Sequence, residues 1–183
     1  MPLDIFKEYK NPVSKESFLC ISNTEDAYTM EWTVAPGGYV PFAHTHEKQT
    51  ETFTVTEGQV KMVVNKKETI IHAGETITVP PKAIHIAFNQ SKENLKCIVS
   101  YSPSLDMELF NQCLLGLTED GYLDKKGGVN IPRMGFCIYG MKGLARPANI
   151  PAPVFRITLF LFYCMGKIAG WNRFYKKYTG LSK

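Results

Sequence analysis

Between residues 17 and 101 the chain alternates short apolar runs with turn-forming segments. Each run has five to eight residues, is rich in β-branched and aromatic side chains, and predicts one strand: SFLCI, AYTMEWTV, ETFTVT, QVKMVVN, ETIIHA, ETITVP, HIAFN and LKCIVSY. The segments between the runs, such as NTED and PGG, favour turns. Many short strands at this spacing predict a sandwich or barrel. No amphipathic helical stretch interrupts them, so a parallel βαβ fold is not expected.

The pattern changes after Tyr101. Ser102 is in a position to cap a helix, with Pro103 at the first helical position. Apolar residues then recur on one side of this helix: Leu105, Leu109, Phe110, Cys113, Leu114 and Leu117. The helix is therefore expected to pack by one face.

The rest of the chain predicts a second helical region. Residues 121–152 are rich in Gly and Pro and give a helical signal only around RMGFCIYGMKGLA. Residues 153–178 predict one helix that is apolar around much of its circumference. We therefore expect a β-barrel over residues 1–103 and a helical extension over residues 104–183.

Composition and charge narrow the class of protein. The 183 residues are 44% hydrophobic and 21% charged, as in ordinary globular domains, and the net charge of +4 gives little support for a nucleic-acid partner. The five cysteines are widely spaced and contain no CxxC pair, and charges stand near the start where a signal peptide would have an apolar core. A reduced, cytoplasmic protein is the expectation.

The stretch AHTHEKQTE, residues 43–51, carries the candidate chemistry. In a strand, His44 and His46 point to the same side, and the four residues EKQT form a turn that brings Glu51 back beside them. Glu51 then stands at the head of an inward row that continues with Phe53 and Val55. A carboxylate there is costly to bury unless it is paired or coordinated, and two imidazoles around a cation remove that cost.

The positions around this stretch resemble the cupin superfamily. The first cupin motif is matched in every defined position: Gly38, His44, His46, Glu51 and Gly58. The second motif follows after 15 residues, with Lys82 where the family usually has glycine: Gly74, Pro80, His85 and Asn89. A non-glycine residue at position 82 has to accept or avoid a positive φ.

The resemblance is to a single-domain (type-2) cupin with a C-terminal helical extension. It implies a mainly β protein whose jelly-roll barrel, a double-stranded β-helix, holds one divalent metal on His44, His46, Glu51 and His85. Three imidazoles and one carboxylate suit Fe, Mn, Ni, Co or Zn. The motifs leave out His72, which is expected at a strand end in solvent.

Four residues are candidates for a substrate pocket near the metal, although core packing alone is the favoured interpretation for any one of them: Trp32, Phe42, Phe53 and Met62. Cys97 is expected to be a small buried hydrophobe. No residue of the barrel stands out as a catalytic acid or base.

Two functions remain open. The chain is a metalloenzyme acting on a small organic molecule, with dioxygenase-like or isomerase-like chemistry, or it is a non-catalytic metal-dependent module that binds or senses a small molecule. A DNA-binding domain is not expected, because the predicted barrel begins within the first twenty residues. A homodimer is expected because cupin barrels commonly pair through edge strands.

The segment 153–178 has two interpretations. It packs on the barrel or across a dimer, or it makes weak contact with a membrane surface, which would make the protein peripheral to the membrane. The second interpretation rests on aromatic residues that alternate with basic ones in GWNRFYKKY.

Overall fold

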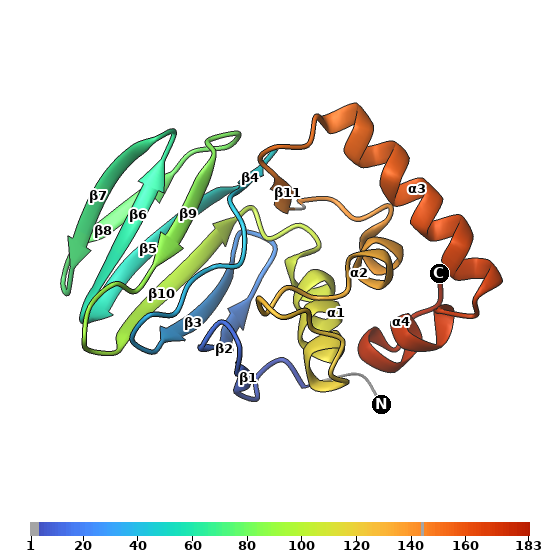
Figure 1. Ribbon diagram of the computed structural model, residues 1–183, viewed down its shortest axis with the longest axis horizontal. Helices are drawn as coiled ribbons and strands as arrows, with labels where there is room; N and C mark the ends of the chain where they lie inside the picture. The colour runs from blue at the N-terminus through green and yellow to red at the C-terminus, as the bar shows by residue number, and fades with distance from the viewer. Residues whose placement is uncertain (1–3, 144) are drawn as a thin grey trace.

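Two antiparallel β-sheets face each other and form the barrel, and the helices gather at one end of it (Figure 1). The computed structural model describes residues 4–143 and 145–183. The six-stranded sheet has the order β1 (Tyr9–Asn11), β2 (Glu16–Asn23), β3 (Tyr28–Val34), β10 (Leu95–Ser102), β5 (Thr50–Glu57) and β8 (Thr76–Val79). The five-stranded sheet has the order β11 (Ala145–Pro147), β4 (His44–His46), β9 (His85–Phe88), β6 (Gln59–Val64) and β7 (Lys67–His72).

All eight predicted runs are strands, and the expected mainly β architecture is confirmed. The alternation of side chains explains why these runs fold as strands around one core. In β3 every second residue is buried, from Tyr28 to Val34, and the same holds along the first six residues of β5. The inward residues of both sheets form a continuous apolar core. Cys97 lies within it, fully buried, as expected.

The first helix begins later than predicted. Helix α1 spans Met107–Glu119 with Asp106 at its N-cap, so the prediction that Ser102 caps it and Pro103 opens it was wrong. The intervening residues are held in a turn instead. The Gln49 side chain donates to the carbonyl oxygens of Pro103 and Ser104, and Leu105 adopts a φ of 48°. A residue in the left-handed region interrupts a helix, so α1 starts only after it.

The Gly- and Pro-rich region contains a helix and a strand. Helix α2 spans Ile131–Ile138, and the Asn130 side chain caps it by accepting from the Arg133 amide. Strand β11 was not predicted, and it pairs with β4 so that Ala145 lies opposite His46. The helical extension therefore contributes one edge strand to the barrel sheet that carries the two histidines.

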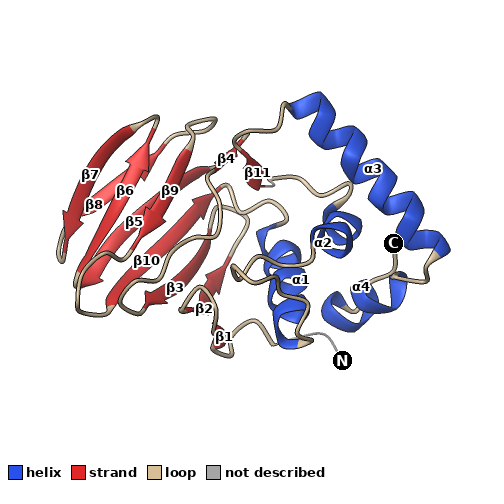
Figure 2. Cartoon of the chain, in the orientation of Figure 1, coloured by secondary structure: helices blue, strands red, loops and turns tan. Residues whose placement is uncertain are grey.

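The C-terminal segment is two helices, where the sequence predicted one. Helix α3 (Ala152–Ile168) and helix α4 (Asn172–Thr179) meet at an angle of 98°, and the turn is visible in Figure 2. Gly170, with a φ of 69°, supplies the left-handed residue that the bend needs. The bend folds α4 back against α1, while α3 packs on α2.

Candidate metal centre

Three strands bring the four predicted residues together. His44 and His46 lie on β4, Glu51 on β5 and His85 on β9, with His44 directly opposite His85. All four side chains are buried, and one ligand atom from each lies within 4.8 Å of the others. Antiparallel pairing places β4 beside β9 in one sheet, whereas β5 belongs to the facing sheet, so residues up to 41 positions apart in the chain meet across the interior of the barrel.

Hydrogen bonds orient two of the imidazoles. Nδ1 of His44 lies 3.2 Å from the carbonyl oxygen of Phe42, and Nδ1 of His85 lies 3.1 Å from that of Ala83. A carbonyl only accepts, so each Nδ1 carries the proton and donates. The Nε2 of the neutral His44 ring is then left with its lone pair, which is the form that binds a metal.

Glu51 links the imidazoles. Its Oε2 lies 2.6 Å from Nε2 of His85 and 3.4 Å from Nε2 of His46. Burial by itself would raise the pKa of Glu51, but the contacts with His46 and His85 outweigh burial and hold the pKa below its usual value. Glu51 is therefore a carboxylate at neutral pH.

The pKa values of His44 and His85 are shifted in opposite directions. Burial, reinforced by the neighbouring His85, lowers the pKa of His44 to about 3, so its ring is neutral. Burial also acts to lower the pKa of His85, but its hydrogen bond to Glu51 raises it above the ordinary value. His44 and Glu51 are therefore in the protonation states that a metal ion requires, whereas Nε2 of His85 carries a proton that a bound ion would displace.

His46 provides the test of whether a metal fits. Neither of its ring nitrogens forms a hydrogen bond with the described residues, and Nε2 has only the 3.4 Å contact with the Glu51 carboxylate, although the side chain is buried. Unpaired buried nitrogens are costly, and a cation bound to one of them removes part of that cost. The cluster of three imidazoles and one carboxylate within reach of one ion therefore fits a divalent metal.

Tyr101 supports the cluster and was not identified from the sequence. It lies opposite Glu51 in the pairing of β10 with β5, and its ring stands edge-on to His46 at 5.4 Å between centroids. Burial and Glu51, with which the phenol shares a hydrogen bond, raise its pKa well above the ordinary value. The neutral hydroxyl therefore donates to the carboxylate and holds it toward the imidazoles.

The cluster opens into a cavity of about 140 Å³. Trp32, Phe42 and Phe53 line it, so they stay candidates for a substrate pocket. Met62 does not line it, so that assignment was wrong: the side chain is fully buried in the core, because the inward face of β6 packs against the opposite sheet. Met107, Phe110 and Leu114 of α1 form part of the wall, so the extension contributes to the cavity.

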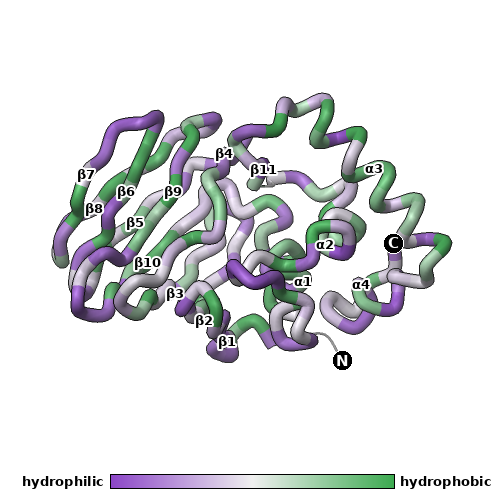
Figure 3. Tube along the Cα trace, viewed as in Figure 1, coloured by the Kyte–Doolittle hydropathy of each residue, from purple (hydrophilic) through white to green (hydrophobic). Residues whose placement is uncertain are grey.

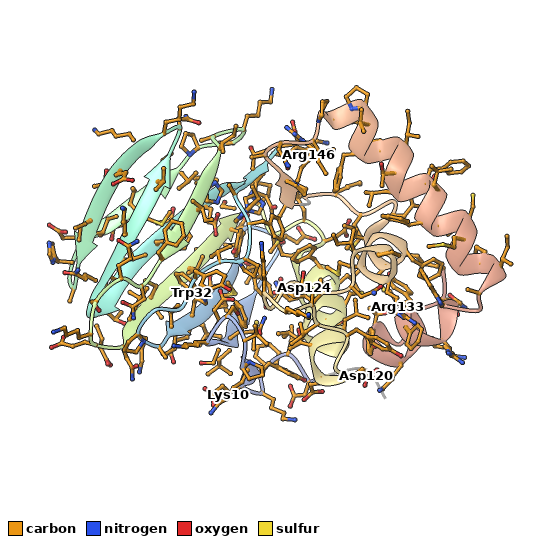
Figure 4. The ribbon with its side chains drawn as sticks, viewed as in Figure 1. Lys10, Trp32, Asp120, Asp124, Arg133 and Arg146 are labelled. Atoms are coloured by element: carbon orange, nitrogen blue, oxygen red, sulfur yellow. The ribbon has the colours of Figure 1, made fainter. Side chains whose placement is uncertain are left out.

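Glu16 is the second residue that the sequence analysis missed. This buried glutamate of β2 lines the same cavity as the metal cluster. Nε1 of Trp32 donates to its Oε1 at 3.0 Å, and the Ser14 hydroxyl donates to its Oε2. Figure 4 labels Trp32 within the barrel. Burial raises the pKa of Glu16 to about 7 even though both hydrogen bonds act to lower it. The signal in the sequence was weak, since Glu16 precedes an apolar run like any strand-flanking charge.

The remaining residues of the motif analysis lie where they were expected. His72 is exposed at the end of β7, remote from the cluster. Lys82 accepts the positive φ, with a value of 68°, and its amide donates to the carbonyl oxygen of His46 at 2.7 Å. The turn that usually contains glycine is therefore formed here by a lysine, and it is tied to a residue of the cluster.

Comparison with known proteins identifies the barrel. The family model of the cupin domain matches residues 30–101, which contain all four residues of the cluster. The comparison with curated proteins found no significant match.

Solved structures of low sequence identity resemble part of this chain. KdgF from a Halomonas species is 16% identical with a TM-score of 0.51, over 60% of this chain and 97% of that one. A sugar phosphate isomerase of the cupin superfamily from Silicibacter pomeroyi is 20% identical with a TM-score of 0.46, over 49% of this chain. The match covers 60% of the length of the Silicibacter protein. A protein with a double-stranded β-helix domain from Klebsiella pneumoniae is 23% identical with a TM-score of 0.46, over 49% of this chain and 78% of that one.

Proposed function

We propose that this chain, a member of the cupin superfamily through its domain at residues 30–101, is a metal-dependent enzyme of the isomerase type. Its substrate would be a small, largely apolar carbonyl compound. One observation carries the proposal: a single cavity is lined both by the four-residue cluster and by Glu16, a buried carboxyl group whose pKa is raised to about 7.

The cluster would hold the metal through His44, His46, Glu51 and His85. When bound, a divalent ion supplies Lewis-acid polarisation of a substrate oxygen. Tyr101 would keep Glu51 in position by its hydrogen bond. The apolar walls would exclude water and orient the carbon skeleton of the substrate.

Glu16 would move the proton. A group with a pKa of about 7 is present as both acid and carboxylate near neutral pH, which suits a residue that takes a proton and returns it. Each carboxylate oxygen can accept two hydrogen bonds, so the bonds from Trp32 and Ser14 leave one position open on each oxygen. The carboxylate would accept a proton from the carbon beside a carbonyl and return it at another carbon.

The walls of the cavity limit the class of substrate. Most of the lining is apolar, and no lysine or arginine of the described residues takes part in it. A phosphate group bound there would lack the basic partner that it usually has in proteins. We therefore do not carry the sugar phosphate named for the Silicibacter structure over to this chain, and we favour a substrate without a phosphate.

Dioxygenase chemistry is the second candidate. The same apolar lining favours it, because dioxygen is small and apolar and partitions into such a cavity. The reaction would consume oxygen, whereas proton transfer within one substrate does not. A non-catalytic module would bind the same compounds without turnover.

The test uses full-length protein loaded in turn with Mn(II), Fe(II), Co(II), Ni(II) and Zn(II). Small ketones and β-diketones are incubated in D₂O, and the exchange of carbon-bound hydrogen is followed by NMR beside an oxygen electrode. We expect exchange without oxygen uptake, and its loss in Glu16→Gln at unchanged metal content. Oxygen uptake that survives Glu16→Gln would support the dioxygenase instead. Thermal stabilisation without either reaction would support the binding module.

A further inference from the structure

Helix α3 exposes a continuous apolar face. Six of the fourteen large apolar residues that are exposed in the described chain lie on this one helix: Val154, Ile157, Phe160, Leu161, Met165 and Ile168. Five of them recur at intervals of three or four residues and so share one side. We call these six residues the outer face of α3. Ile157, Leu161 and Ile168 are 62%, 59% and 91% exposed. Figure 3 shows α3 at the edge of the molecule, with many hydrophobic positions (green) and a few hydrophilic ones (purple) between them.

The opposite side of α3 is fixed to the protein. Leu159 and Gly166 are buried against α2, where the two helices approach closely. A Cβ atom on Gly166 would stand 2.2 Å from the ring of Phe136, and one on Gly135 would stand 2.4 Å from the ring of Phe162. The helix therefore cannot turn its outer face inward without losing this packing.

The charged residues of the segment that contains this face are all basic. Residues 125–183 contain eleven lysines and arginines and no aspartate or glutamate, whereas residues 1–124 contain ten basic and seventeen acidic residues. Arg156 and Lys167 are exposed on α3, eleven positions or about three turns apart, so they lie along one flank of the outer face. Arg156 forms no ion pair within the part of the chain that the structure describes, and Nζ of Lys167 donates to the carbonyl oxygen of Lys183 at 2.8 Å but faces no aspartate or glutamate there.

The basic aromatic segment after α3 has a different role from the one that the sequence suggested. Phe174, Tyr175 and Tyr178 of α4 are buried, and Tyr178 lies against Gly116 of α1. Trp171 stacks under the guanidinium of Arg133, which Figure 4 labels. These rings are packed in the protein, which agrees with the packing interpretation for this part of the segment and not with rings that face a membrane. Arg173 and Lys176 of α4 remain exposed and add to the basic surface.

The length of α3 limits how it could meet a bilayer. Among the described residues no single helix is long and apolar enough to cross a membrane, and only the bent pair α3 and α4 passes that test together. The four helices share a hydrophobic core of their own, separate from the core of the barrel. One side of α3 is packed on α2 and α4 is packed on α1, so a membrane crossing by these two helices would disrupt this helical core. An orientation flat on a surface needs no such change.

We propose that the outer face of α3 docks on an anionic lipid membrane, with the helix lying in the plane of the interface. The six apolar side chains would enter the boundary between headgroups and acyl chains. Arg156 and Lys167 would reach the lipid phosphates beside them, and Arg173 and Lys176 would add attraction from α4. This role is independent of the chemistry in the barrel.

A second copy of the chain is a less suitable occupant of this face. A symmetric dimer would place α3 against its own copy, and each basic flank would then meet another basic flank with no acidic residue from residues 125–183 to balance it. An anionic bilayer offers the complementary charge. The homodimer expected from the sequence would then use other surfaces, such as the edge strands of the barrel.

Vesicle sedimentation of the full-length protein tests the proposal. Vesicles of phosphatidylcholine alone are compared with vesicles that also contain phosphatidylserine, at low and at high salt. We expect binding to the anionic vesicles in low salt and its weakening in high salt. Leu161→Gln with Ile168→Gln should weaken binding by at least about tenfold. Arg156→Gln with Lys167→Gln should weaken it by about fivefold per residue removed.

The matched control is Ile70→Gln on β7, a residue that is 51% exposed on the barrel and should not affect binding. Unchanged melting temperatures show that the variants fold. The proposal is overturned if the wild-type protein does not sediment with anionic vesicles in low salt, or if the α3 variants and the control bind equally. It is also overturned if light scattering shows a dimer that Leu161→Gln with Ile168→Gln disrupts while vesicle binding is absent.

Discussion

The interior of the barrel and the outer face of α3 are opposites in the kind of side chain that each buries or exposes. The barrel buries ionisable groups, among them His46, Glu51 and Glu16, in an otherwise apolar cavity. Helix α3 exposes large apolar groups such as Ile157 and Ile168 and surrounds them with positive charge. Each arrangement costs free energy in isolation, so each indicates a partner: a cation and a substrate inside, and an apolar, anionic surface outside.

The most direct way to sharpen this contrast is to remove the buried charge at Glu16. Its pKa is raised in the folded protein to about 7, from an ordinary value of 4.5. Between these values the folded state binds more protons than the unfolded state. The stabilisation is therefore complete below pH 4.5 and is lost as the pH rises through 7. The loss amounts to about 3 kcal/mol.

In Glu16→Gln this dependence should disappear. We expect the free energy of unfolding of the wild type, relative to the variant, to fall by up to about 3 kcal/mol between pH 5 and pH 8. Urea denaturation of both proteins at equal metal content measures the difference. If the free energy of unfolding depends on pH in the same way in both proteins, the pKa of Glu16 is not raised in the folded state. The basis for its role in proton transfer would then be lost.

The two sides of α3 provide the next contrast. Gly166→Ala places a methyl group 2.2 Å from the buried ring of Phe136, and we expect it to lower the free energy of unfolding by about 1 to 3 kcal/mol. Leu161→Gln, five residues earlier on the outer face, should change it by less than about 0.5 kcal/mol. Thermal and urea unfolding check both. An equal cost at the two sites would mean that the outer face is packed in solution, as a dimer contact would be.

Tyr101→Phe tests the support of the cluster with a smaller effect. The variant loses only the hydroxyl that donates to Glu51, so the carboxylate is held less firmly. We expect metal affinity to fall by about tenfold, or about 1.4 kcal/mol. Competition with a chelator measures it. Tyr39→Phe, which removes a hydroxyl bonded to the Lys126 carbonyl outside the cavity, should leave affinity unchanged. Equal affinity in Tyr101→Phe and the wild type would contradict the role of this tyrosine.

The sequence predicted correctly those features that depend on neighbouring residues in the chain or on the spacing of a known motif. Alternation of buried and exposed residues identified the strands, because a half-buried strand has a period of two. The placement of His44 and His46 two positions apart put both on one side, and the motif spacing joined them to Glu51 and His85. The metal, its identity and its role as a cofactor stay predictions, although the geometry of the four residues fits them.

The features that were missed depend on long-range contacts. Glu16 is buried by residues of other strands and Tyr101 by its opposition to Glu51, and neither is visible in its own neighbourhood of the sequence. Strand β11 exists because β4 offers an edge to pair with, not because ARP favours a strand. The start of α1 shifted because Gln49, from the barrel, holds the preceding turn. Tertiary contacts override local propensity at each of these places.

Metal content measured by mass spectrometry tests the central claim most directly, that the buried cluster is a metal site. The account predicts about one divalent ion per chain in the wild-type protein after reconstitution and dialysis. It predicts less than about a tenth of that in His46→Ala, which removes a buried ring whose nitrogens have no other described partner, and no loss in the exposed control His72→Ala. A wild-type protein that retains no metal, or equal retention in the two variants, would contradict it.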